Sequence, residues 1–150
     1  MSSKTAGFVP AGEVRVFRAF GEEIHFHLTG AQTGGLLAQW LEITPPGGGP
    51  PPHYHTGEDE WFCVLEGKMS FLLDGVWREA EPGAGVFAPK NSIHAFKNTG
   101  DTPSRMLVAA SPAGFEDFFE RAAAEFARPD GPDMDRVTQI AADQGIHFVE

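Results

Sequence analysis

The chain has 150 residues, the size of one ordinary domain, and its single cysteine, Cys63, excludes an intramolecular disulfide framework and a structural zinc site built on several thiolates. Lys and Arg number 11 against 21 Asp and Glu, and the formal net charge of -10 argues against nucleic acid and anionic membrane surfaces as partners, because both need a basic footprint. No apolar run approaches the roughly 20 residues that cross a bilayer, and residues 1–6 lack the apolar core of a secretion signal, so we expect a cytoplasmic protein.

Short apolar runs separated by regular turn residues predict an all-β domain over residues 1–110, folded as a small barrel or sandwich. Asp74-Gly75 is the clearest hairpin signal. Three glycines followed by three prolines, residues 47–52, predict a flexible hinge and then a stiff extended stretch. The expected elements, in chain order, are a loose arm over 1–12 and strands over 14–17, 23–28, 36–44, 60–65, 68–73, 76–80, 85–88, 93–97 and 105–110.

The pattern changes after Ser111, and residues 111–150 are expected to form a C-terminal helical appendage packed on the β domain. Apolar residues recur at three- and four-residue steps from Phe115 to Phe126, which predicts an amphipathic helix capped by Ser111 with Pro112 at its first position. A second helix is expected over 132–143, followed by a short strand over 146–149. We interpret the phenylalanine stripe as core packing rather than as a ligand site, because aromatic stripes at helical spacing usually pack.

The strand over 60–65 is apolar on both faces, so both faces should be covered. One face belongs to the domain interior. The other face carries Trp61 and Cys63, and its cover must be the C-terminal helices, a second sheet or another subunit. We therefore predict that a helix or a partner chain packs on Trp61, and that Cys63 is a small buried hydrophobe.

Three histidines and one glutamate have the spacing of a metal site. His53 and His55 are two residues apart, so an extended segment places both imidazoles on one face, and the preceding prolines restrict the backbone. Glu60 opens the next strand, and His94 begins a later one. Neutral nitrogens with one hard oxygen suit one divalent first-row transition metal, whether Fe, Mn, Ni, Co, Cu or Zn, and disfavour calcium.

Other polar residues have simpler interpretations. His25 and His27 repeat the two-residue spacing, but no third ligand lies near them in sequence, so we interpret them as solvent-facing or hydrogen-bonded. Glu58 and Asp59 are expected in a solvated turn, with a role in orienting a ligand histidine as the alternative.

The ligand spacing resembles the cupin family. Two sets of residues carry the resemblance. The first cupin motif is resembled by the spacing of Gly47, His53, His55, Glu60 and Gly67, and the second by that of Gly75, Pro82, Gly83, Pro89, His94 and Asn98. The resemblance covers roughly residues 36–110. It implies a jelly-roll-like β-barrel with inward metal ligands and a homodimer. The glycine–proline lead-in and the stretch after the barrel resemble small cupins called quercetin dioxygenase-like.

Four protein ligands leave one or two coordination positions open for a substrate. Phe62 and Val64 share a strand side with Glu60, and Phe96 shares a side with His94. The remaining candidates for the pocket wall are Phe71, Phe87, Leu72 and Trp40. An apolar pocket over a metal favours an aromatic or enol-type small molecule that chelates through oxygens. The hypothesis is a dioxygenase in which Glu60 is the catalytic group that accepts the substrate's proton.

Three other functions compete. A sugar-phosphate isomerase or epimerase would need Lys or Arg in the cup to hold phosphate, and the few basic residues between 36 and 110 lie mostly at strand ends. A metal-dependent hydrolase or lyase is compatible with the same ligands. A module that binds a small molecule or metal without turnover is the non-enzymatic alternative.

Overall fold

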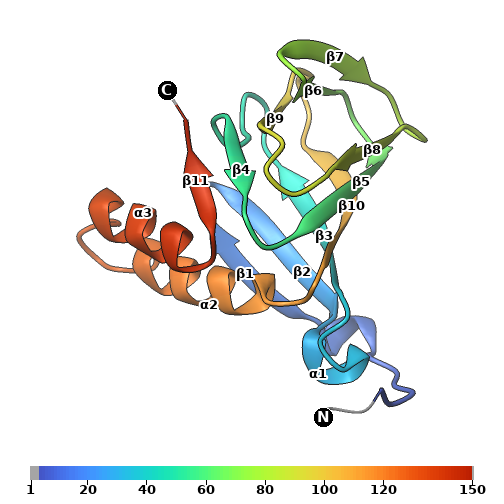
Figure 1. Cartoon of the computed structure of the whole chain (residues 1–150), viewed down its shortest axis with the longest axis vertical. Coiled ribbons are helices and arrows are strands. Elements are labelled where there is room, and N and C mark those ends of the chain that lie inside the picture. Colours follow the sequence, from blue (N-terminus) through green and yellow to red (C-terminus); the bar gives the residue numbers. More distant parts are fainter. Residues whose placement is uncertain (1–3, 150) are drawn as a thin grey trace.

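The computed structural model describes residues 4–149 (Figure 1). Its strands form two antiparallel sheets, of order β1-β2-β3-β10-β5-β8 and β11-β4-β9-β6-β7. The strands are β1 (Arg15–Ala19), β2 (Glu22–Leu28), β3 (Ala38–Thr44), β4 (His53–His55), β5 (Asp59–Glu66), β6 (Met69–Leu73), β7 (Val76–Ala80), β8 (Gly85–Ala88), β9 (His94–Asn98), β10 (Ser104–Ser111) and β11 (Ile146–Phe148). The helices are a 3-10 turn (Ala11–Glu13), α1 (Gly30–Thr33), α2 (Phe115–Phe126) and α3 (Met134–Asp143).

The predicted all-β, jelly-roll-like fold with C-terminal helices is confirmed, as two facing sheets rather than one continuously bonded barrel. Alternation places Ile24 and Phe26 of β2 and Trp40 of β3 in the interior, and Leu41 on the other face of β3 is buried as well. Trp40, Phe71 and Met106 are fully buried in this core. The interior is therefore rich in aromatic side chains, which supply the walls against which the site is built.

The glycine–proline loop before β4 is bonded to the sheet, so the expected flexible hinge is wrong. The Gly47 N–H donates to the Asn98 carbonyl at 2.9 Å, and the Asn98 N–H donates to the Gly48 carbonyl at 2.9 Å. Gly49 has φ 136° and lies so close to the carbonyl of Phe96 that a Cβ atom would overlap it. Glycine is required there because the loop must approach the β9 backbone next to His94.

The C-terminal helices differ from expectation at their N-termini. Ser111 pairs with Asp59 as the last residue of β10, and its hydroxyl donates to the Leu36 carbonyl at 2.6 Å, so it does not cap a helix. Helix α2 begins at Phe115 after Gly114. Helix α3 begins two residues later than expected, because the Asp133 side chain accepts from the first N–H groups of the helix. No helix within residues 4–149 has the length and apolarity needed to span a membrane.

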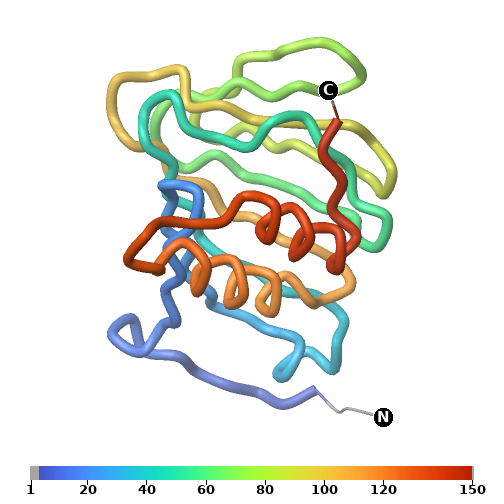
Figure 2. Tube along the Cα trace, turned by 90° about the vertical axis from the view of Figure 1, so that its left-hand side faces the viewer, coloured from blue at the N-terminus to red at the C-terminus, as the bar shows by residue number. Residues whose placement is uncertain are grey.

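The chain after residue 111 returns to the site-bearing sheet. Helix α2 packs on β1, α3 packs on α2, and β11 pairs with β4 (Figure 2). In that pairing Ile146 lies opposite His55, and Phe148 lies opposite His53. The C-terminal region is thus a strand as well as two helices, and it contacts the histidine-bearing strand directly.

Trp61 is 40% exposed, so the predicted helical cover of this residue is wrong. Its register partner on β8 is Phe87, which is also exposed, and Cys63 is half-buried rather than buried. The reason is the sheet order: α2 packs on β1 at one edge, whereas β5 and β8 lie at the opposite edge. A second subunit stays the predicted cover for this face.

Candidate functional site

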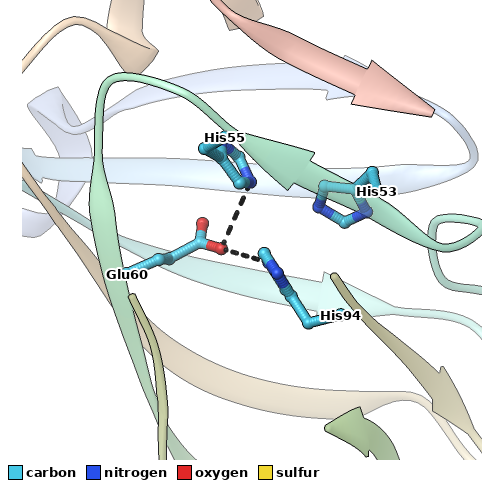
Figure 3. A group of neighbouring side chains, drawn as sticks. All are labelled: His53, His55, Glu60 and His94. Atoms are coloured by element: carbon cyan, nitrogen blue, oxygen red, sulfur yellow. Dashed lines mark hydrogen bonds and ion pairs between the residues drawn. The ribbon is translucent and has the colours of Figure 1, made fainter. Parts of the chain in front are cut away.

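Four buried side chains from three strands converge at one point inside the sandwich (Figure 3). His53 and His55 project from β4, Glu60 from β5 and His94 from β9, and one nitrogen or oxygen of each lies within 4.8 Å of the others. His53 and His94 are directly paired across β4 and β9. The structure therefore brings together all four of the predicted metal ligands.

Backbone carbonyls fix the tautomers of two of the imidazoles. The Nδ1–H of His53 donates to the Pro51 carbonyl at 2.8 Å, and the Nδ1–H of His94 donates to the Ser92 carbonyl at 2.9 Å. Each bond leaves the Nε2 atom facing the cluster. Hydrogen bonds of this kind from the far nitrogen are how proteins orient histidines that ligate metals.

His55 is buried, and neither of its ring nitrogens has a hydrogen-bond partner among the described residues. Its Nε2 lies 3.7 Å from Glu60 Oε1, and its Nδ1 lies 3.5 Å from Glu58 Oε2. An orphaned polar atom at this depth costs roughly 1–3 kcal/mol unless another group satisfies it. A cation bound to Nε2 would do so, and the set of three nitrogens and one carboxylate fits a first-row divalent metal.

Glu58 is 4% exposed, so its expected position in a solvated turn is wrong. Gln144, just beyond α3, donates from its Nε2 to Glu58 Oε1 at 3.0 Å. The other oxygen faces the His55 ring. The alternative interpretation fits this geometry, because Gln144 holds the carboxylate where it can orient that imidazole.

The electrostatics of the cluster prepare it for a cation. Burial, with a further contribution from the charge on His94, lowers the pKa of His53 from 6.5 to about 4. Burial also disfavours the charged forms of Glu60 and His94, but their mutual hydrogen bond, at 3.2 Å, outweighs it, so the pKa of Glu60 is lowered and that of His94 is raised. His53 is therefore neutral and Glu60 anionic at neutral pH, the protonation states that metal ligation requires, whereas the raised pKa of His94 favours an imidazolium whose proton a bound metal would displace.

A cavity of about 380 Å³ opens onto this cluster. His53, His55 and Glu60 form part of its lining, and the rest is mainly aromatic. Its aromatic residues are Phe20, Trp40, Phe96, Phe115, Phe118, Phe119 and Phe148. No Lys or Arg lines it within the described part of the chain. The site is thus an apolar cup with a few convergent polar groups, the usual form of a small-molecule site.

The predicted wall residues divide into three groups. Trp40 and Phe96 line the cavity. Phe62, Val64 and Phe71 are buried in the core and Leu72 is half-buried, and none of the four lines the cavity, although the Phe62 ring lies 6.2 Å from the His94 ring. Phe87 is 57% exposed on the outer face, so its assignment to the pocket is wrong. Its strand is short, and Val86 and Ala88 hold the more protected positions on either side of it.

The phenylalanine stripe of α2 was interpreted as core packing alone, and that interpretation is incomplete. Phe115, Phe118 and Phe119 are buried, and they also line the cavity. The Phe115 ring lies 5.2 Å from the His55 ring. Helical periodicity predicts that these residues are covered, but it does not say what they cover.

Two buried carboxyl groups of the cavity wall were missed by the sequence analysis. Glu22 on β2 and Glu42 on β3 are 6% and 5% exposed, and both line the cavity. Their spacing offered a signal. Glu22 is two residues from Ile24 and Glu42 is two residues from Trp40, so each glutamate lies on the same inward face as its apolar neighbour. His25, by contrast, faces outward and lies 3.1 Å from Glu23 Oε1, as expected for a residue outside the site.

Comparison with known proteins agrees with this geometry. Residues 40–110 match the family model described as a Cupin domain. The polyketide synthase protein CurC of Streptomyces cyaneus is 30% identical over 105 residues, which are 69% of this chain and 68% of CurC. Quercetin 2,3-dioxygenase of Bacillus subtilis is 30% identical over 101 residues, 66% of this chain but 29% of the enzyme.

A solved structure, that of the polyketide cyclase RemF from Streptomyces resistomycificus, superposes with a TM-score of 0.61 at 25% identity, covering 71% of this chain and 80% of RemF. The matched segment of the family model contains all four of the converging side chains. Together with the two-way coverage of CurC, these likenesses show that the chain belongs to the cupin superfamily.

Proposed function

We propose that this cupin is a metal-dependent dioxygenase that acts on an aromatic or enol-type small molecule. The observation that carries the proposal is the apolar, aromatic-walled cavity of about 380 Å³ whose lining includes His53, His55 and Glu60 of the four-residue cluster. A flat, weakly charged molecule fits such a wall, and its oxygens would lie at the polar end of the cavity. The likeness to quercetin 2,3-dioxygenase supports the same substrate class.

The chain's own residues bind, orient and deprotonate the substrate. Trp40 and Phe115, whose rings pack against each other with centroids 5.0 Å apart, are part of the aromatic wall that a planar molecule would contact. Glu60 is an anionic carboxylate at neutral pH, so it is the acceptor for the proton of an enol or phenol. His53, His55, Glu60 and His94 would hold one divalent first-row transition metal, which would polarise the substrate oxygens and supply the chemistry of dioxygen.

Ring closure of an enolisable polyketone is the second candidate function. It is favoured by the likeness to two proteins whose names mention polyketides, CurC and RemF, each of which matches this chain over more than two thirds of both lengths. The same cavity suits both reactions, because each begins from an enol held by its oxygens. A dioxygenase consumes oxygen, whereas ring closure with loss of water does not.

Sugar-phosphate isomerisation is disfavoured by the lining of the cavity. A bound phosphate needs a cationic or dense N–H environment, and neither Lys nor Arg is among the lining residues that the structure describes. The buried Glu22 and Glu42 make the cavity still less suitable for an anion. Hydrolysis and simple binding stay as the remaining alternatives, and binding without conversion is one of the outcomes of the test below.

The test begins with elemental analysis of the purified protein, followed by oxygen uptake with a panel of flavonols and 1,3-diketones. We expect about one transition-metal ion per chain and a product that contains both atoms of dioxygen. His94→Ala should lose the metal and the uptake together, because it removes a ligand at the centre of the cluster. His25→Ala is the matched control, since that imidazole faces outward, and it should retain both.

The alternatives give different results in the same assay. A product that has lost water without oxygen consumption would replace the dioxygenase by ring closure. A metal-loaded protein that binds the panel without converting any member would make it a binding module. Metal retention in both His94→Ala and His55→Ala would show that the assigned ligands are wrong.

A further inference from the structure

Two buried carboxyl groups, Glu22 and Glu42, lie on the cavity wall without a cationic partner among the described residues, whereas buried charges are usually paired. Glu22 and Glu42 come from neighbouring strands and lie within hydrogen-bonding reach of each other. Glu42 Oε1 accepts from the Trp40 indole N–H at 3.0 Å, and Glu22 Oε2 accepts from the Thr44 hydroxyl at 2.7 Å. The two side chains are thus held in fixed positions by two buried donors.

Neither carboxyl group makes an ion pair with a Lys, Arg or His within residues 4–149. Burial, followed by the charge of the neighbouring Glu22, raises the pKa of Glu42 well above its ordinary value, and burial raises the pKa of Glu22. Two buried carboxylates this close cannot both ionise easily, so the pair retains one proton. Burial and the neighbouring carboxylate both raise the pKa of Glu42, so Glu42 is the side of the pair on which that proton is favoured.

The fold does not need this pair for stability. Buried acidic groups without a cationic partner cost free energy, and apolar residues of similar volume would be as good or better in a core. Both groups line the same cavity as His55, whose buried ring nitrogens have no hydrogen-bond partner among the described residues. An acid pair without a cationic partner on the wall of this cavity points to a bound small molecule that contacts it.

We propose that Glu42 and Glu22 are a second catalytic group of this cavity, an acid–base pair that interconverts the keto and enol forms of the bound substrate. The pair lies on the wall made by β2 and β3, whereas the metal-ligand residues come from β4, β5 and β9. The pair therefore supplies proton transfer without using the metal-ligand residues. The inference rests on the proposed function for its substrate class, an enolisable or aromatic small molecule.

The proton transfer balances without an oxidant or a reductant. In the keto direction, the Glu42 carboxylic acid gives its proton to the α-carbon of the enol, where the electron pair of the C=C bond forms the new C–H bond. In this exchange, unlike the metal-dependent reaction in which Glu60 takes the substrate proton, the enol O–H proton passes to the Glu22 carboxylate. As that O–H bond breaks, its electron pair completes the C=O bond. The proton then returns from Glu22 to Glu42 across their hydrogen bond, which restores the pair.

The test uses 1-phenylbutane-1,3-dione, diluted as its enol into buffer that contains the full-length, metal-loaded protein, with loss of the enol absorbance as the readout. We expect the wild-type protein to accelerate ketonisation, and Glu42→Gln to lower the protein-dependent rate constant by about 100-fold, since positioned acid–base groups contribute roughly 10²–10⁴. Glu22→Gln should lower it similarly. Glu23→Gln is the matched control, because it is the adjacent carboxylate on the outward side of β2, and its rate should equal that of the wild type.

A second measurement tests for the protonated carboxylic acid itself and does not depend on turnover. Difference infrared spectroscopy at neutral pH should show the carbonyl band of a protonated carboxylic acid in the wild type and in Glu23→Gln, and should lose it in Glu42→Gln. Repeating the ketonisation assay after chelation should leave the effect of Glu42→Gln in place. Circular dichroism of each variant checks that the fold is retained, and glutamine, which has the same shape and no charge, preserves the packing.

The outcomes separate this inference from the proposed function. If oxygen uptake fails but ketonisation is lost in Glu42→Gln, the dioxygenase is wrong and the acid–base pair stands. If the wild type does not accelerate ketonisation, or if Glu42→Gln matches the wild type, the pair has no catalytic role. Absence of the protonated-acid band at neutral pH would also overturn the proposal, since no shared proton would then exist.

Discussion

The pH dependence of the metal-free protein provides a quantitative test of the site. The perturbation is His53→Gln, made in protein stripped of metal by chelation. In the folded state the pKa of His53 is about 4, because burial and then the charge on His94 disfavour the imidazolium, whereas the value for an unperturbed histidine is 6.5. Between these two values the unfolded chain binds a proton that the folded chain does not. The free energy of unfolding therefore falls as the pH is lowered through this window, and the contribution is fully restored above 6.5.

The magnitude follows from the width of the window. Each pH unit is worth about 1.4 kcal/mol, so a window of about 2.5 units amounts to about 3 kcal/mol. About 2 kcal/mol of it lies between about pH 7 and about pH 4.5, the range over which unfolding can be measured conveniently. His94 and Glu60 also titrate, but they are present in both proteins, and a neutral His53 adds no charge that would alter them.

The assay is urea unfolding followed by tryptophan fluorescence, at both pH values, on wild type, His53→Gln and the outer-face control His25→Gln. We expect the wild type and the control to lose about 2 kcal/mol more than His53→Gln on acidification. Parallel losses in all three proteins would refute the reasoning, because they would show that His53 is not buried as a neutral imidazole in the folded chain.

Four further predictions concern the candidate metal site, the carboxylate beside His55, the cavity wall and the exposed face around Trp61. His55→Ala should abolish stoichiometric metal retention in elemental analysis, whereas His25→Ala should retain it. Glu58→Ala should weaken metal affinity by about 10- to 100-fold in chelator competition, because the imidazole beside it loses its orienting carboxylate; unchanged affinity would remove this role. Phe119→Ala should lower the free energy of unfolding in urea by roughly 3–5 kcal/mol, as a buried ring is lost from the core; a cost below about 1 kcal/mol would show that the ring is not packed. Trp61→Glu should convert a dimer into a monomer in sedimentation velocity, and a monomeric wild type would contradict the second subunit expected on that face.

Local sequence patterns were sufficient for the strands and for the ligand set. The alternation in β2, the Asp74-Gly75 turn and the two-residue spacing of His53 and His55 act over a few residues, and the structure contains each of them. The positions of Glu60 and His94 could be assigned because their spacing, too, resembled a known pattern. In these cases the deciding interactions are short-range or are repeated throughout a family.

Local patterns could not decide which face of β5 or β8 points into the interior, because β5 is apolar on both faces and β8 is short. The pattern predicts Phe87 in the pocket and Trp61 under a helix or a partner chain, yet within this chain both lie exposed on one outer face. A four-residue strand such as β8 gives too little alternation to fix its parity. Which side is covered depends on where α2 packs, and that contact is made with β1 at the far edge of the sheet.

By itself, the sequence determined the strand periodicity and the four residues that converge as candidate metal ligands, because both depend on spacing along the chain. Only the tertiary structure decided the contents of the cavity. It placed the α2 phenylalanines over the histidines, returned β11 to β4, and set Glu22 beside Glu42. These neighbours are far apart in sequence, and their pKa values and reactivity come from burial and mutual charge, which exist only after the sheets and helices have packed.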